Sequence, residues 1–95
     1  MTWTVKLNRK AAKQVEDLRK NVLDLFKFLV KEMEILGPIR GNWRNYSALT
    51  DRRHHCHIKT GRPTYVAVWE IKSKKERLIE VIYVGTHEGS PYQKH

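Results

Sequence analysis

Residues 65–86, YVAVWEIKSKKERLIEVIYVGT, decide how this chain folds. Two runs within the stretch are rich in β-branched and aromatic residues, which favour extended strands, and the residues SKKE between them are typical of a turn. Apart from Glu80, the run LIEVIYVG is apolar at nearly every position, which indicates an internal strand covered on both faces. The stretch therefore predicts two long neighbouring strands in the middle of a sheet.

Two further strands are predicted just before this pair. The run RHHCHIK (53–59) is followed by the turn residues TGRP, and NYSAL (45–49) is a weaker candidate. Because side chains alternate along a strand, the cationic and titratable residues of the first run should share one face. These residues are Arg53, His55, His57 and Lys59, with His54, Cys56 and Ile58 on the other face. The first face fits an anion-binding surface, a metal site or a solvated edge.

The N-terminal half predicts one strand and two helices. WTVKL (3–7) alternates apolar and polar residues, as half-buried strands do. Asn8 is a suitable N-cap for a helix over KAAKQVEDLRK, and Asn21 is a plausible cap for a second helix with a continuous apolar stripe. Gly37 and Pro38 should end this second helix.

Together these elements predict an α+β fold in the order β-α-α-β-β-β. Two N-terminal helices should pack on one face of a small, mainly antiparallel sheet, in a single domain over residues 1–95. The single cysteine excludes an internal disulfide, and no paired cysteines indicate a zinc module. No segment is apolar and long enough for a membrane span or a secretory signal, so we expect a cytoplasmic protein without a membrane partner.

The charge balance points to a polyanionic partner. A formal net charge of +9 and an isoelectric point near 9.9 draw a protein towards nucleic acid. The basic segment GNWRNY adds Arg44 to the residues that could contact RNA, while its Trp43 is expected in or beside the core. A membrane surface fits less well, because the predicted helices carry mixed charges.

Three segments carry a resemblance to a known family. YSAL, HCHIKTGRPTYVAVWE and IEVIYVGTHEGSPY, in this element order and in a small basic chain, resemble the RelE and HigB toxins of bacterial toxin-antitoxin systems, within the RelE/ParE superfamily. The resemblance implies a RelE-like fold and a ribosome-dependent mRNA endoribonuclease (mRNA interferase) that acts in the 30S decoding site and represses translation. It also implies a cognate antitoxin as partner, and neither a metal nor a cofactor.

The resemblance further implies which residues carry the chemistry. Such cleavage needs a base for the ribose 2′-hydroxyl, cations for the phosphate and an acid for the leaving 5′-oxygen, and it leaves a 2′,3′-cyclic phosphate. The matching catalytic candidates are His57, Lys59, Arg62, His87 and Tyr92. The residues expected to bind RNA are Arg44, Arg53, His55 and Glu88. Glu88 is also a candidate base, and which histidine is base and which is acid stays open.

Thr86 and His87 stand where several members of the family carry an arginine after the last strand. Because of this departure, the division of catalytic roles stays open, and other interpretations of the sequence remain. A ParE-like toxin would bind a protein target on the same scaffold without cleaving RNA, and a basic RNA-binding domain would not be toxic. His55 and His57 could hold zinc or nickel, but no third ligand has a recognisable spacing. The gathering of histidine, lysine, arginine and tyrosine favours the nuclease.

Overall fold

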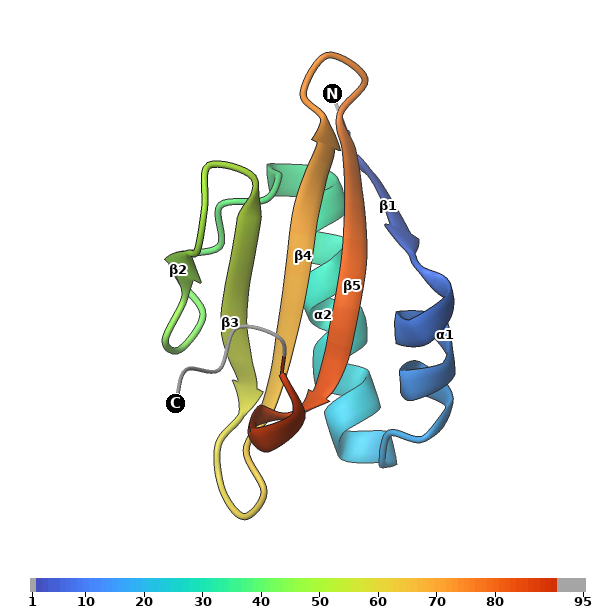
Figure 1. The fold of residues 1–95 in the computed structure, drawn as a ribbon, viewed down its shortest axis with the longest axis vertical. Coiled ribbons are helices and arrows are strands. Elements are labelled where there is room, and N and C mark those ends of the chain that lie inside the picture. Colours follow the sequence, from blue (N-terminus) through green and yellow to red (C-terminus); the bar gives the residue numbers. More distant parts are fainter. Residues whose placement is uncertain (1, 91–95) are drawn as a thin grey trace.

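Five strands form one sheet, and two helices cover one of its faces (Figure 1). The computed structural model describes residues 2–90. The elements are β1 (Thr4–Leu7), α1 (Arg9–Glu16), α2 (Lys20–Leu36), β2 (Ser47–Ala48), β3 (Arg53–Lys59), β4 (Tyr65–Ser73), β5 (Leu78–Thr86) and the short 3₁₀ helix η1 (His87–Gly89). The predicted α+β fold is confirmed, with each predicted strand present near its predicted position.

The strands lie in the order β1-β5-β4-β3-β2. β1 pairs with β5 in parallel, while the other neighbours are antiparallel. β5 therefore lies inside the sheet, as its apolar sequence predicted, and Ile79, Val81 and Val84 are fully buried beneath the helices. The parallel pair joins the first strand of the chain to the last, so it depends on tertiary packing and has no local sequence signal.

Of the three predicted helix ends, two are correct and one is wrong. The side chain of Asn8 caps α1 by accepting a hydrogen bond from the Ala11 N–H at 2.8 Å, as predicted. The predicted cap at Asn21 is wrong, because α2 already begins at Lys20 and the Asn21 side chain accepts from its neighbour, Val22. Val22, within the first turn of α2, is buried in the core, so packing holds this helix end, which has no side-chain cap. Gly37, at φ 95°, ends α2 as predicted.

The main core lies between the helices and the sheet. Trp69 is fully buried there and donates its indole N–H to the Pro38 carbonyl at 3.0 Å. Cys56 also lies in this core, and burial raises the pKa of its thiol to about 12. Among residues 2–90, no helix combines the length and the apolar character needed to cross a membrane.

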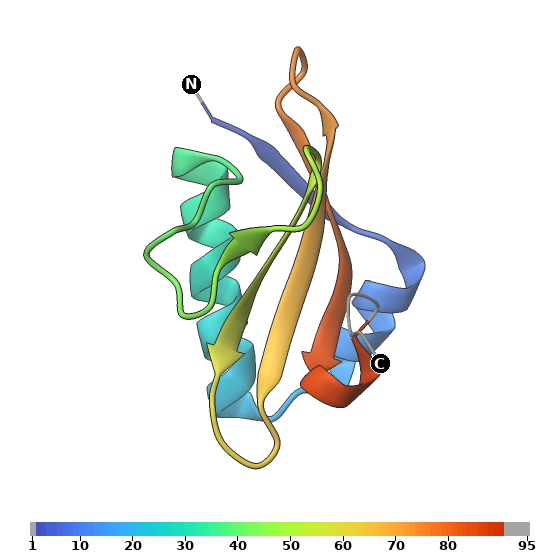
Figure 2. The same cartoon turned by 60° about the vertical axis from the view of Figure 1, so that its left-hand side comes forward.

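The opposite side of the sheet, called the open face below, carries a smaller apolar cluster and most of the polar strand residues. Val66, Val68 and Tyr83 form this cluster, next to His55 and His57 on β3. Figure 2 shows β3 and β4 with α2 behind them. The predicted separation of Cys56 from the two histidines is confirmed, because Cys56 packs in the core on the helix side.

A β-bulge changes the predicted row of residues on β3. His57 pairs with Val66, but Lys59 pairs with Tyr65, so the register shifts by one residue between them. Tyr65 packs against the helix-side core, and Lys59 lines a recess beside Arg19 at the start of α2. The prediction of a shared face is therefore correct for Arg53, His55 and His57 and wrong for Lys59.

Candidate functional site

The β3–β4 turn and η1 meet at one end of the open face, which is the lower end in Figure 1. Between them lies an open pocket of about 520 Å³, called the histidine pocket below. It is lined by His57 from β3, by residues 61–64 from the turn, and by His87 and Glu88 from η1. Residues thirty positions apart in the sequence, 57 and 87, are thus brought to one site.

A backbone hydrogen bond fixes η1 against the turn. The His87 N–H donates to the Thr64 carbonyl at 2.8 Å, which extends the pairing of β4 and β5 by one step beyond Thr86. Because this bond holds the first residue of η1, the His87 ring faces His57. The two ring centroids are 5.5 Å apart, and the ring planes meet at 74°.

Tyr83 supports η1 from the open face. Its hydroxyl donates to the Thr86 carbonyl at 2.7 Å, directly before His87. The hydroxyl would lie only 3.0 Å from a Cβ placed on Gly85 and 2.8 Å from one placed on Gly89, so neither position has room for a side chain. The tyrosine followed by two glycines positions the helix that carries His87. The sequence analysis did not identify Tyr83, although Gly85 and Gly89, which flank residues 86–88, were a usable signal.

Asn45 was also missed, and it touches His57. The Asn45 side-chain nitrogen lies 3.5 Å from His57 Nε2, a long contact that fits an amide N–H facing a neutral imidazole. Asn45 has a positive φ of 55°, a conformation that asparagine tolerates better than most residues. The neighbouring Arg44 carbonyl accepts the His57 backbone N–H at 2.8 Å. The loop before β2 therefore holds His57 from both its backbone and its side chain.

The electrostatics of the pocket favour a neutral His57 among cations. Burial lowers the pKa of His57, and the nearby charges of His87 and Arg44 lower it further. At neutral pH this imidazole is therefore unprotonated and can accept a proton. Within residues 2–90, neither Arg44 nor Arg62 forms a salt bridge. Their charges remain available to an anion that enters the pocket.

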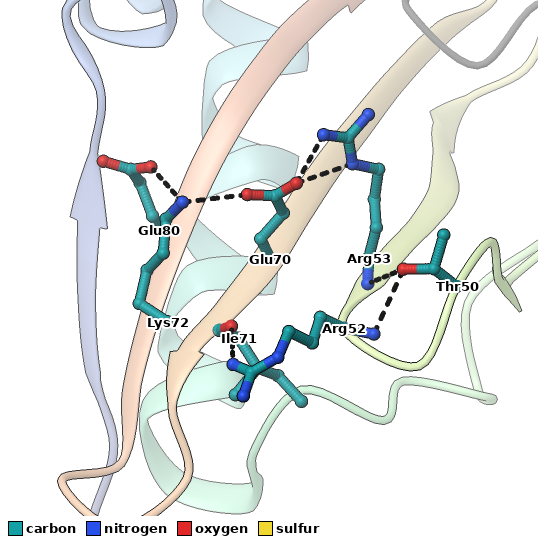
Figure 3. Close-up of polar contacts among 7 residues, drawn as sticks. All are labelled: Thr50, Arg52, Arg53, Glu70, Ile71, Lys72 and Glu80. Atoms are coloured by element: carbon teal, nitrogen blue, oxygen red, sulfur yellow. Dashed lines mark hydrogen bonds and ion pairs between the residues drawn. The ribbon is translucent and has the colours of Figure 1, made fainter.

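The other end of the open face has a different electrostatic character. Four charged side chains form a chain of ion pairs across β3, β4 and β5, called the charge ladder below: Arg53, Glu70, Lys72 and Glu80 (Figure 3). Arg53 donates from Nε and Nη2 to one oxygen of Glu70, the first at 2.7 Å. Lys72 reaches the other Glu70 oxygen at 3.0 Å and Glu80 at 3.4 Å.

The predicted site residues fall into distinct groups. His57, Arg62, His87 and Glu88 line the histidine pocket. Arg44 adjoins it, Arg53 belongs to the charge ladder, and Lys59 lies on the helix side. His55 lies next to His57 but is only 7% exposed, and its Nδ1 is 3.2 Å from the Ser47 hydroxyl. Tyr92 lies outside the described residues.

The part of the chain that the structure describes contains no cluster of three or more His, Cys, Asp or Glu side chains that could hold a metal ion. The His55 and His57 ring centroids are 6.3 Å apart. Burial lowers the pKa of His55, and the charge of His57 lowers it further.

Comparison with known proteins identifies the fold. No protein-family model and no curated protein matches the sequence. The structure resembles a double mutant of E. coli toxin RelE in the free state, with a TM-score of 0.73 and 18% identity over 97% of this chain and 90% of that one. A metal-bound toxin from Helicobacter pylori gives 0.69 and 22% identity, with 93% and 97% covered.

A third similar structure is RelE in an archaeal RelE-RelB complex from Pyrococcus horikoshii OT3. Its TM-score is 0.62 at 15% identity, with 95% of this chain and 100% of that chain covered. At such identities the likeness establishes the fold. The chain has the fold of RelE toxins, as the sequence predicted.

Proposed function

We propose that this chain with a RelE fold is the toxin of a toxin-antitoxin system, and that it cleaves mRNA on the ribosome. The observation that carries the proposal is the histidine pocket, where two imidazoles face each other beside an arginine that has no ion pair among residues 2–90. A formal net charge of +9 is consistent with a ribosomal substrate. A site of this kind has the groups that RNA cleavage by the 2′-hydroxyl requires.

In the proposed reaction, His57 is the general base. Its lowered pKa leaves it neutral at physiological pH, so it can take the proton of the ribose 2′-hydroxyl. The 2′-oxygen then attacks the phosphorus, and the bond from phosphorus to the 5′-oxygen breaks. His87 lies across the pocket and donates a proton to this leaving oxygen. The products are a 2′,3′-cyclic phosphate and a free 5′-hydroxyl.

The arginine residues supply charge stabilisation. Arg62 lies in the pocket wall, where its planar guanidinium can bind two phosphate oxygens at once. Arg44 adds positive charge near His57. Lys59, on the helix side of the hairpin, is assigned a weaker role in attracting the RNA backbone. Glu88 is retained as a second candidate base, and Tyr92 as a further catalytic residue.

The partner in this proposal is a cognate antitoxin that keeps the toxin from ribosomes in the cytoplasm. Its support is fold-level analogy, since two of the similar structures are complexes of RelE with RelB. The expected complex should form reversibly and block access to the histidine pocket.

The test is cleavage of a defined mRNA by the purified protein on programmed ribosomes, with analysis of the product ends. We expect cleavage that depends on ribosomes, leaves a 2′,3′-cyclic phosphate and continues in excess chelator, because side chains fill each proposed role. The metal-bound toxin among the similar structures makes the chelator informative. Growth arrest without RNA cleavage would instead favour a toxin that binds a protein target.

A further inference from the structure

A second pocket lies at the end of the molecule opposite the histidine pocket. It has a volume of about 450 Å³ and lies between the end of α2, the start of β1 and the β4–β5 turn, at the upper end of Figure 1. We call it the α2-end pocket. Its apolar walls are Trp3, Leu36, Pro38, Ile39 and Ile71. The proposed cleavage of RNA uses none of these residues.

The mouth of the pocket exposes large aliphatic side chains. Leu36 is 64% exposed and Ile39 is 66% exposed, and Ile35, which directly precedes Leu36 in the last turn of α2, is 55% exposed. Leu36 and Ile39 also line the pocket, so apolar surface continues from its wall to the outside. Contiguous apolar surface of this kind is typical of a contact with another protein.

A buried imidazole in the pocket wall is not fully hydrogen-bonded. His54 is 4% exposed, and its Nδ1 lies 2.7 Å from the Tyr46 hydroxyl. Its Nε2 has no hydrogen-bond partner among residues 2–90. When Tyr46 donates to Nδ1, the neutral ring carries its proton on Nε2, which then needs an acceptor. The nitrogen is itself covered by surrounding atoms, so His54 belongs to the pocket wall and reports on its surroundings without contacting a ligand directly.

The charged residues around the pocket, two cations and one carboxylate, favour an acidic ligand. Lys74 and Arg77 come from the β4–β5 turn, while Asp51 is the acidic residue among the described lining. Within the part of the chain described, neither Lys74 nor Arg77 forms a salt bridge. The Arg77 guanidinium lies 5.9 Å from the centre of the Trp3 ring, so it stands at the apolar wall. Carboxylates next to an apolar group would meet both cations.

We infer that the α2-end pocket binds a segment of a partner protein in which an apolar side chain is flanked by carboxylates. The apolar side chain enters between Trp3 and Ile39, against the wall to which His54 belongs, and the carboxylates pair with the cations of the turn. The exposed aliphatic side chains beyond the mouth favour a protein over a small metabolite. This inference goes beyond the proposed function and does not depend on RNA cleavage.

The test uses the whole protein and a synthetic hexapeptide with a Leu-Phe pair between two pairs of glutamates. Binding is followed in NMR spectra of the histidine side chains, and affinity is measured by titration. One control peptide carries Ala-Ala in place of Leu-Phe. The variant Lys74→Glu/Arg77→Glu reverses the mouth charges, and Lys6→Glu/Lys13→Glu reverses two exposed charges elsewhere as a matched control.

We expect a saturable shift of the His54 signals with the Leu-Phe peptide. The Ala-Ala peptide and the mouth variant should each bind about tenfold more weakly, whereas the control variant should stay within about twofold of the unmodified protein.

Four results would overturn the inference. The first is no saturable shift at His54, and the second is equal binding of both peptides. The third is an equal loss in the mouth and control variants, which would show attraction by net charge alone. Self-association that Leu36→Glu abolishes would also overturn it, since a second copy would then be the occupant of this surface.

Discussion

The two ends of the open face carry similar numbers of charged and titratable groups but use them differently. In the charge ladder, two cations and two carboxylates neutralise one another across three strands. In the histidine pocket, imidazoles face each other beside arginines that have no salt bridge within residues 2–90. The charges of the ladder are thus already paired within the sheet, whereas Arg44 and Arg62 have no salt bridge among the described residues and, in the proposed function, bind the phosphate.

Arg53 and Arg62 make this difference concrete. Both were expected from the sequence to meet RNA, and they lie on one hairpin. Arg53 lies opposite Glu70 in the strand register and is held by that carboxylate. Arg62 lies in the turn, where no described carboxylate is paired with it. On this hairpin, Arg53 is thus paired because a carboxylate lies opposite it on the neighbouring strand, whereas Arg62, in the turn, has no such neighbour among the described residues.

The largest expected effect is loss of a histidine from the pocket. His57→Ala and His87→Ala should each lower the rate of mRNA cleavage by about 10² to 10⁴, because each removes a proton transfer. Single-turnover cleavage on programmed ribosomes measures this rate. The Tm should hardly change, and a folded variant with full activity would remove that histidine from the mechanism.

Loss of the Tyr83 hydroxyl should have the next largest effect. Tyr83→Phe removes the hydrogen bond that holds Thr86 beside His87, so cleavage should slow by about tenfold to a hundredfold through misplacement of the acid. Tyr83 acts through η1, so kcat should fall while KM stays constant. An equal loss of activity and of thermal stability would instead indicate that Tyr83 only supports the fold.

Breaking the charge ladder should affect stability alone. Glu70→Gln removes the carboxylate shared by Arg53 and Lys72, and it should lower the free energy of unfolding by about 1–2 kcal/mol. Urea denaturation measures the change, and Glu80→Gln at the exposed end of the ladder is the milder control. The rate of cleavage should stay within about twofold of that of the unmodified protein, since no residue of the ladder is in the described lining of the histidine pocket.

The smallest expected effect is the dependence of stability on pH. The pKa values of His54, His55 and His57 are all lowered, mainly by burial. Below about pH 6.5 the unfolded chain binds protons that the folded chain excludes, so the free energy of unfolding falls as the pH decreases. Above this pH the histidine contribution is constant.

Glu70 extends the fall in stability to lower pH. Hydrogen bonds from Lys72 and Arg53 lower the pKa of its carboxyl. The stability that this carboxylate contributes to the fold is therefore lost only as the pH falls below the ordinary pKa of a glutamate. Urea unfolding from about pH 8 to about pH 3 should show both steps. His54→Phe should reduce the first step, and an unchanged first step would remove His54 from this account.

The sequence predicted most of the fold because the signals were local. β-branched runs marked the long strands, and the Asn8 cap and Gly37 marked helix ends. The failures occurred where packing decides. α2 starts before Asn21, where packing of the buried Val22 takes the place of a side-chain cap. Lys59 changes face because β3 contains a bulge, which no residue type in the sequence indicates. The parallel pairing of β1 with β5 also depends on distant residues.

Part of the lining of the histidine pocket could be predicted from the sequence, but the residues that hold it could not. His57, Arg62, His87 and Glu88 were named from the resemblance and do line one pocket. The partners that hold them, Asn45 and Tyr83, were missed, because an asparagine in a loop and a tyrosine in a strand look the same whether or not they support a site. Arg53 was assigned to RNA because its pairing with Glu70 depends on strand register.

The most direct test of the central claim compares the two arginines of the hairpin. Arg62→Ala and Arg53→Ala remove the same side chain from the same hairpin, and both variants are measured for mRNA cleavage on programmed ribosomes and for unfolding in urea. Arg62→Ala should slow cleavage by about 10² to 10³ with little change in stability. Arg53→Ala should lower the free energy of unfolding by about 1 kcal/mol with cleavage nearly unchanged. Equal cleavage by both variants, or a larger loss with Arg53→Ala, would contradict the division of the open face into a structural and a catalytic end.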